Sequence, residues 1–442
     1  MHAVVPRTHA SGLFDRLAGM DGFGLFLSGF IIVYAATSLG IEHMLGVIGF
    51  AKTPYLNAAA YLYTLTFLGL GVTFNKVSLR FFLPHPFGLL VIALLSISCV
   101  IGIANDNAAQ YIVAWAFYIL AGVLVFQLFR NPRRPAASAE GAVATLLSLP
   151  FMALMLALAI LSIFNKENHY QYMLFEVIAL FAILVRPRPI EKALGVALYL
   201  LLHLGSNEGF VQVEINRASI LAVGTVGLLY LIYRRHLVVT LFLIVAVVGG
   251  LFYAVSLDDN TVDTLPRNIK EAIYLMKGDD IYNHISSYQR VFEGQKVMED
   301  FESASETEWL FGKGLGRTVD MTGAADRTPG QHALLGALQV HNIHFLHYAV
   351  FHKFGLAGLS VVIALAGGLL WMFAVDLGRG RMDEALLFFY FYLFYVLVFA
   401  FPASNFLIAN PLWPAFLGML CWLRAAKRDA GIVNPNPSAA LT

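Results

Sequence analysis

Three basic residues of this 442-residue chain are of the types that handle phosphate and protons. Arg217 opens a long apolar run, Arg290 lies in a polar stretch, and His341 stands shortly before a later apolar run. An arginine fork makes bidentate contacts with phosphate, so two arginines could neutralise a pyrophosphate. A neutral imidazole titrates near pH 7 and could accept a proton from an incoming hydroxyl. Together they suit a transfer reaction with a phosphorylated leaving group.

The two arginines also have simpler interpretations. Arg217 could pair with Glu214, or extend its charged end toward lipid headgroups. Arg290 could merely solvate the surface of a helix, with Glu293 as its neighbour one turn later. Spacing alone is compatible with these structural roles and with phosphate binding.

His341 belongs to a short segment that also holds His344, His347 and His352. Two histidines spaced as 341 and 344 could coordinate a metal from one helix. No carboxylate or cysteine lies close by in the sequence to complete such a site, so we expect neither a metal nor another cofactor.

The segment 311–316 has the sequence Phe-Gly-Lys-Gly-Leu-Gly. A phosphate-binding loop of this kind follows a strand and ends in Gly-Lys-Ser/Thr, and both features are missing here. We therefore interpret the segment as a tight bend.

Glu176 lies within an apolar run, where a carboxylate is costly and by default indicates function. It could equally hydrogen-bond a neighbouring helix. A transporter would place several such groups near the membrane midplane, together with broken helices. The apolar runs hold little that is polar besides Glu176 and His203, which argues against a transporter.

Composition places the chain in a membrane. Hydrophobic residues make up 59% of it and charged residues 13%, against about 25% charged residues in soluble domains. The apolar runs approach the roughly 20 residues that a helix needs to cross a bilayer, and they do not alternate as barrel strands would. The net charge of +1 gives no reason to expect nucleic acid as a partner. The sequence predicts an all-α polytopic membrane protein.

We expect about twelve transmembrane helices, at 22–41, 56–74, 87–104, 110–129, 142–164, 171–185, 190–205, 217–233, 237–257, 355–375, 385–401 and 406–423. Positively charged connections stay in the cytoplasm. Lys and Arg alternate between connections, which puts both termini in the cytoplasm and leaves only Lys52, Lys166 and Arg217 in the short outer turns.

The expected helices divide the chain into four parts. Nine membrane helices occupy 1–257, a large outward loop 258–340, an outer helix with three more membrane helices 341–424, and a cytoplasmic tail 425–442. Within the loop, five apolar residues recur at roughly helical spacing and predict a helix: Ile285, Tyr288, Phe292, Met298 and Phe301. A second outer helix is expected over 341–354, leading into the tenth span.

Three motifs, in this order, resemble those of the O-antigen ligase and polymerase family of the bacterial envelope. They are Asn216-Arg217-Ala218-Ser219 at the mouth of a span, the run from Tyr288-Gln289-Arg290 to the Gly-rich bend, and His341-Asn342-Ile343-His344-Phe345-Leu346 with the following Gly355-Leu356-Ala357-Gly358. The resemblance covers roughly 217–375. The chain departs from it at Asn216, where the family commonly has a small hydroxyl residue.

This resemblance implies a fold and a reaction. The fold would be like that of the GT-C glycosyltransferases, and the donor would be a glycan on undecaprenyl pyrophosphate. Arg217 and Arg290 would bind the pyrophosphate, and His341 would activate the acceptor hydroxyl. Three further residues of the same motifs would join the site: Tyr288, Asn342 and His344. The reaction would need no metal and would invert the anomeric centre. The enzyme would sit among the lipids of the bacterial inner membrane, with its site facing the periplasm.

Two reactions fit the resemblance. A ligase moves the glycan onto a sugar hydroxyl of lipid A–core and completes lipopolysaccharide, whereas a polymerase moves it onto another lipid-linked repeat. Polymerases of the family often have two sizeable outer loops, and this chain has one, which favours the ligase. A non-enzymatic exporter of lipid-linked glycan is the alternative from another class. It would form no covalent product and would need a path through the spans.

Overall fold

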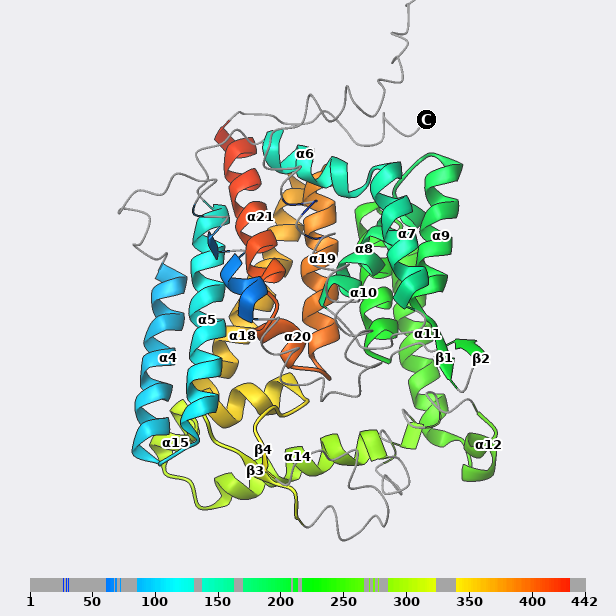
Figure 1. Cartoon of the computed structure of the whole chain (residues 1–442). Coiled ribbons are helices and arrows are strands. Elements are labelled where there is room, and N and C mark those ends of the chain that lie inside the picture. The colour runs from blue at the N-terminus through cyan, green and yellow to red at the C-terminus, as the bar shows by residue number, and fades with distance from the viewer. Residues whose placement is uncertain are drawn as a thin grey trace, which may run out of the picture.

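The computed structural model describes residues 61–66, 86–130, 137–162, 170–207, 210–213, 217–265, 285–322 and 339–429, with single positions at 27, 29, 31, 68, 69, 72, 270, 273, 274 and 277. In these parts of the chain, helices predominate and are accompanied by two short two-stranded sheets (Figure 1). The predicted helical character is confirmed.

The elements follow one another in this order: α4 Pro86–Ala104, α5 Ala109–Arg130, α6 Ala137–Leu146, α7 Leu149–Ser162, α8 Tyr170–Leu184, α9 Pro189–Leu202, β1 Leu204–Asn207, β2 Phe210–Val213, α10 Arg217–Tyr233, α11 Leu237–Ser256, α12 Asp259–Asp263, α14 Ile285–Glu302, α15 Glu306–Phe311, β3 Val319–Asp320, β4 Gln339–Val340, α18 Leu346–Gly378, α19 Glu384–Ala400, α20 Asn405–Ile408 and α21 Leu412–Asp429.

Several of the described helices are suited to a membrane. Four of them, α4, α5, α11 and α18, are long and apolar enough to cross it. The pair α6 and α7, bent by 48°, adds a fifth if it forms one span. Shorter apolar helices occupy most of α8, α10 and α19. The chain is therefore a helical membrane protein. The predicted spans 22–41 and 56–74 lie largely outside the described residues.

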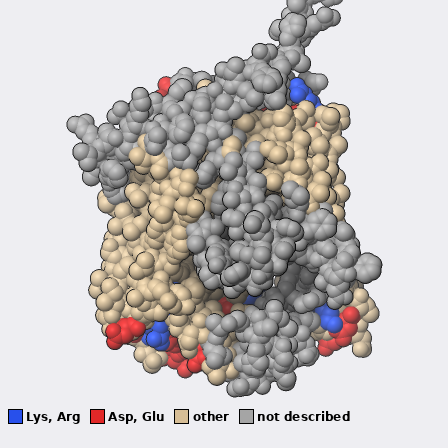
Figure 2. Space-filling model, viewed as in Figure 1, with Lys and Arg blue, Asp and Glu red and all other residues tan. Residues whose placement is uncertain are grey.

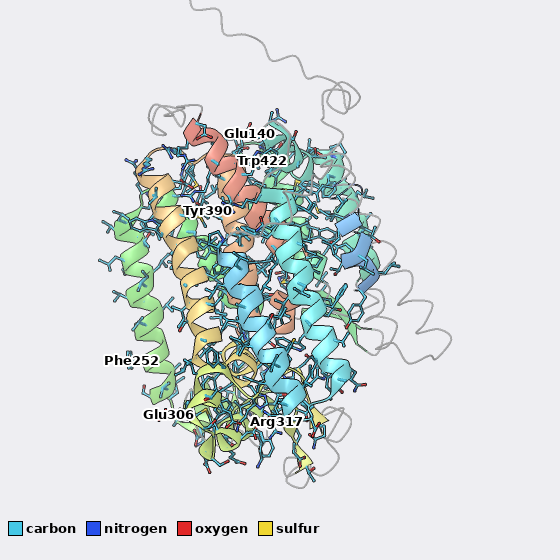
Figure 3. The ribbon with its side chains drawn as sticks, turned by 90° about the vertical axis from the view of Figure 1, so that its left-hand side faces the viewer. Glu140, Phe252, Glu306, Arg317, Tyr390 and Trp422 are labelled. Carbon is cyan, nitrogen blue, oxygen red and sulfur yellow. The ribbon has the colours of Figure 1, made fainter. Side chains whose placement is uncertain are left out.

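The surface of the bundle has the polarity that a bilayer requires. Figure 2 shows charged side chains at the two ends and a belt of other residues between them. Apolar side chains on α11 are exposed as well: Val238 is 83% exposed and Phe252 76%. Figure 3 shows Phe252 pointing away from the bundle. Helices that expose such apolar faces are stable in contact with lipid rather than with water.

The core of the bundle is built around α19. Nearly every side chain of this helix is buried, including Tyr390, Tyr392 and Tyr395. Its rings meet those of neighbouring helices edge to face, as Phe388 does with Phe181 of α8 at 5.6 Å between ring centroids. Close packing of this kind holds helices together in lipid, where the exclusion of water adds little between them.

Ion pairs join the helices at one end of the bundle, the upper end in Figure 1, which we call the tail end because α21 finishes there. Arg424 of α21 bonds Asp376 of α18 (Nε to Oδ2, 2.5 Å). Arg186, just after α8, bonds Glu384 of α19 (Nη1 to Oε2, 2.7 Å). The connections rich in Lys and Arg were predicted to share one side of the membrane. Those that carry Arg186 and Arg424 do lie at the same end of the bundle. That this side is the cytoplasm stays a prediction.

The opposite end, the loop end, carries α14, α15 and the strands β3 and β4 (Figure 1). The predicted loop helix is confirmed as α14. Its residues Phe292, Val297 and Phe301 are buried in a second core that α4, α5 and α18 complete. Met298, predicted for the same face, is 41% exposed. The loop helix is thus packed onto the bundle rather than hanging from it.

The structure differs from the sequence prediction at four places. The helix expected over 341–354 begins at Leu346, after a turn. The fifth span is bent between α6 and α7, and the twelfth is broken into α20 and α21, with Pro411 just before α21 because its ring removes a helical N–H donor. An antiparallel hairpin, β1 with β2, pairs Leu204 with Val213 where only a connection was expected.

Candidate functional site

The Gly-rich turn, residues 312–316, is a bend packed against α4 and α18. The N–H of Leu315 donates to the carbonyl of Ser98 in α4 at 3.0 Å, and the N–H of Lys313 donates to a carbonyl of α18 at 2.8 Å. The amide of Asn107 donates to the carbonyls of Lys313 and Leu315, both at 3.0 Å. Two N–H groups that a phosphate loop would offer are therefore already bonded, and the interpretation as a bend is confirmed.

Glycine is required at Gly314 in this bend and at Gly355 in α18, for the same two reasons. Gly314 has φ 85° and lies so close to α4 that a Cβ would overlap the backbone of Gly102. Gly355, where α18 is kinked, has φ 62°, and a Cβ there would overlap the backbone of Leu310 in α15. Both the left-handed conformation and the close backbone approach exclude a side chain. The kink lets the first turns of α18 lie across the loop end.

Asp300 ties the end of α14 to the bend and to α18. Arg317 forms a two-pronged contact with its carboxylate (Nε to Oδ2, 2.9 Å; Nη2 to Oδ1, 2.5 Å). Nε2 of the fully buried His352 lies 3.0 Å from Oδ2. Burial alone would raise the pKa of Asp300, but the hydrogen bonds from His352 and Arg317 outweigh it and hold the pKa well below its usual value.

The turn before α18, residues 341–345, is held by hydrogen bonds from Ser404 and Lys353. Ser404, between α19 and α20, donates its hydroxyl to the carbonyl of Ile343 (2.5 Å) and its N–H to the carbonyl of His344 (2.8 Å). Lys353 donates from Nζ to the carbonyl of His341 at 2.8 Å. The main chain that carries both histidines is therefore fixed relative to the bundle.

His344 is oriented by a buried carboxylate. Oε2 of Glu293 accepts the N–H of His344 at 2.8 Å, and Nδ1 of the ring lies 2.8 Å from Oε1. Glu293 is fully buried, whereas the side chain of His344 is 37% exposed. Gln289 donates to the same carboxylate at 3.1 Å. Among the described residues Nε2 of His344 has no hydrogen-bond partner, so it can accept a proton from outside.

His341 has a different environment. Its ring stacks flat on Tyr111 of α5, with 3.7 Å between ring centroids and 6° between planes. Burial, with a smaller contribution from the charge of Lys353, lowers the pKa of His341 to about 4. The Lys353 ammonium is fully buried and lies 4.4 Å from the ring centre of Trp115. His341 is therefore neutral above about pH 5, but only weakly basic.

Of the other four predicted site residues, the structure describes the side chains of two and only the backbone of the other two. Arg290 is partly buried on α14, three residues before Glu293. Asn342 is partly buried in the turn that carries the histidines. Arg217 is the first residue of α10 and Tyr288 lies in the first turn of α14, but their side chains lie outside the described part of the structure. The approach of Arg217 to Arg290 stays a prediction.

Glu176 connects three helices. It is buried on α8, hydrogen-bonds Ser219 near the start of α10, and lies 3.8 Å from Nε2 of His203 at the end of α9. Of the two interpretations left open by the sequence, hydrogen bonding to neighbouring helices is the one that these contacts support.

An apolar cavity of about 250 Å³ opens between α4, α5, α18 and α21. Trp115, Val350 and Phe354 line it toward the loop end. Trp115 also underlies Nζ of Lys353, so the cavity ends beside a buried basic side chain. Its lining could receive a hydrocarbon chain from the bilayer.

The described residues contain no group of three or more His, Cys, Asp or Glu side chains that could hold a metal ion. In the comparisons with known proteins, no family model matches the chain and no curated protein matches it. The functional argument therefore rests on the geometry of the loop end.

Sequence reasoning missed the two charged residues that organise this end. Glu293 was considered only as a surface neighbour of Arg290, and Lys353 was not considered. Both are fully buried. The one signal available in the sequence was that Glu293 directly follows Phe292, one of the apolar residues that predicted this helix.

Proposed function

We propose that this chain is an O-antigen ligase. It would transfer a glycan from undecaprenyl pyrophosphate to a sugar hydroxyl of lipid A–core, without a metal and with inversion. In this proposal the bundle has about twelve membrane helices in a GT-C-like arrangement. It lies in the bacterial inner membrane, with the tail end in the cytoplasm and the loop end in the periplasm.

One contact carries the proposal, the Glu293–His344 pair. It joins α14, the helix of Arg290, to the histidine turn, although the two residues are 51 positions apart in the sequence. The helix with a candidate phosphate-binding arginine is thereby joined to the turn with a candidate base at the loop end. That combination is what transfer from a pyrophosphate donor needs.

We assign the base to His344 in place of His341, the residue favoured by the sequence. The Glu293 carboxylate beside Nδ1 favours the tautomer in which Nδ1 carries the proton and Nε2 is free to accept one. A general base works best with a pKa near the working pH. The pKa of about 4 makes His341 a poor base, and its ring is occupied by Tyr111.

The proposed step is a single displacement. The acceptor oxygen attacks the anomeric carbon and forms the new C–O bond, while the bond from that carbon to the pyrophosphate oxygen breaks. The electron pair leaves with the pyrophosphate, and the hydroxyl proton passes to Nε2 of His344. Arg290 and Arg217 would stabilise the charge that develops on the pyrophosphate, and the loss of one such donor costs about 10²–10³-fold in rate.

The apolar cavity supports a lipid-borne donor. It ends near the loop end beside Trp115, over which Nζ of Lys353 lies. A polyprenyl chain in the cavity would bring its pyrophosphate toward this end, while the glycan extends into water. No such arrangement is needed by an enzyme with a soluble sugar-nucleotide donor.

A purified transfer assay tests the function. The full-length protein, reconstituted in nanodiscs, is incubated with undecaprenyl-pyrophosphate glycan, with and without lipid A–core. Glycosylated lipid A–core, formed only when both are present, is expected for the ligase. Extension of the donor by itself would identify a polymerase. The absence of any covalent product, under conditions where a known ligase works, would favour the exporter.

A further inference from the structure

A groove at the loop end is distinct from the apolar cavity. It has a volume of about 560 Å³ and runs between α14 and the start of α18. One wall is a face of α14 with Gln295, Met298 and Glu302, all of which are exposed. Ligand sites commonly fall within roughly 300–1,000 Å³, so the groove has room for one or two sugar rings.

The facing wall is aromatic. The rings of Phe345, His347, Tyr348 and Phe401 line it. His347 stacks on Phe401 with 5.1 Å between ring centroids and lies 4.3 Å from the ring of Tyr348. Phe401 is 50% exposed, although a ring of that size is usually covered. Such rings offer flat apolar faces at little entropic cost.

The two walls together match the surface of a sugar. A pyranose has an apolar C–H face that packs on an aromatic ring and an edge of hydroxyls that needs hydrogen-bond partners. The amide of Gln295 and the carboxylate of Glu302 can supply those partners. Apolar walls with a few placed polar groups are the usual composition of a small-molecule site.

The charge of the groove favours a sugar over a phosphate as its ligand. The charged side chains that line the groove are Glu299 and Glu302, and Glu299 is paired with Lys296 (2.5 Å). A pyrophosphate or a phosphorylated sugar would meet like charge here, which disfavours binding. The groove therefore suits an uncharged or amino sugar.

The groove also adjoins the proposed base. Phe345 on one wall follows His344 directly, and Gly294 on the other wall follows Glu293. Gly294 is buried against Tyr348, because a Cβ at that position would overlap the Tyr348 ring. Each wall of the groove is thus one residue along the chain from a member of the proposed His344–Glu293 pair.

We propose that this groove binds the uncharged sugars of the glycan acceptor and is an acceptor subsite separate from the pyrophosphate site. The assignment of these sugars to the acceptor rests on the proposed function, whereas sugar binding itself can be measured without transfer.

Binding is tested first, on the full-length protein in nanodiscs. The probe is the core oligosaccharide released from lipid A–core by mild acid hydrolysis and then dephosphorylated, observed by saturation-transfer NMR with no donor present. Tyr348→Ala removes a ring of the wall. Met298→Trp fills the groove from the exposed face of α14, and it covers the case in which Tyr348→Ala fails to fold. Leu310→Trp, at an exposed position of α15 outside the groove, is the matched control.

We expect the affinity of the oligosaccharide to fall at least tenfold in Tyr348→Ala and Met298→Trp and to be unchanged in Leu310→Trp. In the transfer assay, Met298→Trp should raise the KM for lipid A–core at least tenfold and leave the KM for the donor unchanged. No binding to the wild type, or equal binding to all variants, would overturn the subsite. If binding follows this pattern but no transfer occurs, the sugar site stands and the ligase function fails.

Discussion

The carboxylate of Glu293 contacts His344 twice, through the main-chain N–H at 2.8 Å and through Nδ1 of the ring at 2.8 Å. The first contact fixes where the residue lies, and the second fixes how its ring is turned. Because Glu293 is fully buried, the pair is shielded from water on the carboxylate side. Such a pairing is the usual way in which a protein orients a histidine base.

Replacement of Glu293 should affect catalysis more than binding. Glu293→Gln keeps an oxygen that can accept from His344 but removes the charge that favours the productive tautomer. We expect kcat to fall by about 10²-fold, within the range that general-base catalysis contributes, while the KM values for both substrates stay within about twofold. Steady-state kinetics in nanodiscs measure this, with Glu306→Gln, an exposed glutamate at the loop end labelled in Figure 3, as the control. An unchanged kcat would remove Glu293 from the mechanism.

The arginines should require the guanidinium fork and not only its charge. Arg290→Lys and Arg217→Lys each retain a cation, but an ammonium cannot make the bidentate phosphate contact. We expect about a 10²–10³-fold loss in kcat/KM for the donor in each. Arg379→Lys, at an exposed position of the tail end, should be fully active. Full activity of Arg290→Lys would show that charge alone suffices there.

The Gly-rich turn should tolerate no side chain at Gly314. In Gly314→Ala the left-handed backbone costs about 1–2 kcal/mol, and the overlap with Gly102 adds roughly 1–3 kcal/mol. We expect a lower melting temperature in detergent and faster proteolysis of the segment that carries α14 and α15. Gly224→Ala, on α10 where an added Cβ would meet open space, should melt at or above the wild-type temperature. Equal melting of Gly314→Ala and wild type would contradict the packed turn.

Asp300 should make stability depend on pH in acid. Its pKa is lower in the folded protein than in the unfolded chain, so its contribution is present above about pH 4, the unfolded value, and is lost as the pH falls further. Asp300→Asn should therefore lower the free energy of unfolding at pH 7 by about 1.5–3 kcal/mol, as expected for hydrogen bonds to charged groups. The difference between wild type and variant should shrink below pH 4. A difference that stays constant from pH 7 to pH 3 would show that the Asp300 charge contributes nothing.

Much of the fold follows from local sequence properties. Apolar runs of membrane-spanning length predict α4, α5, α11 and α18, and the spacing of Phe292 and Phe301 predicts α14. The breaks are harder to anticipate. The kink at Gly355 exists because the backbone of Leu310 packs there, and that residue is 45 positions away. Packing between distant segments overrides helix periodicity at such points.

The candidate site shows the same limit. Arg290 and the histidine turn were found from residue type alone, because arginine and histidine suit phosphate and proton chemistry. The sequence could not show which of His341 and His344 is better placed to act as a base, because this depends on which residues contact each ring. Tyr111 covers one and Glu293 orients the other, and both partners come from other segments.

A comparison of two matched variants tests the central claim most directly. His344→Phe and His341→Phe each replace an imidazole with a ring that cannot take a proton, and Phe at position 341 can still stack on Tyr111. The measurement is the rate of glycan transfer from undecaprenyl pyrophosphate to lipid A–core by protein in nanodiscs. We predict a loss of at least about 10²-fold for His344→Phe and less than tenfold for His341→Phe. Loss with His341→Phe and normal transfer with His344→Phe would contradict the assignment of the base.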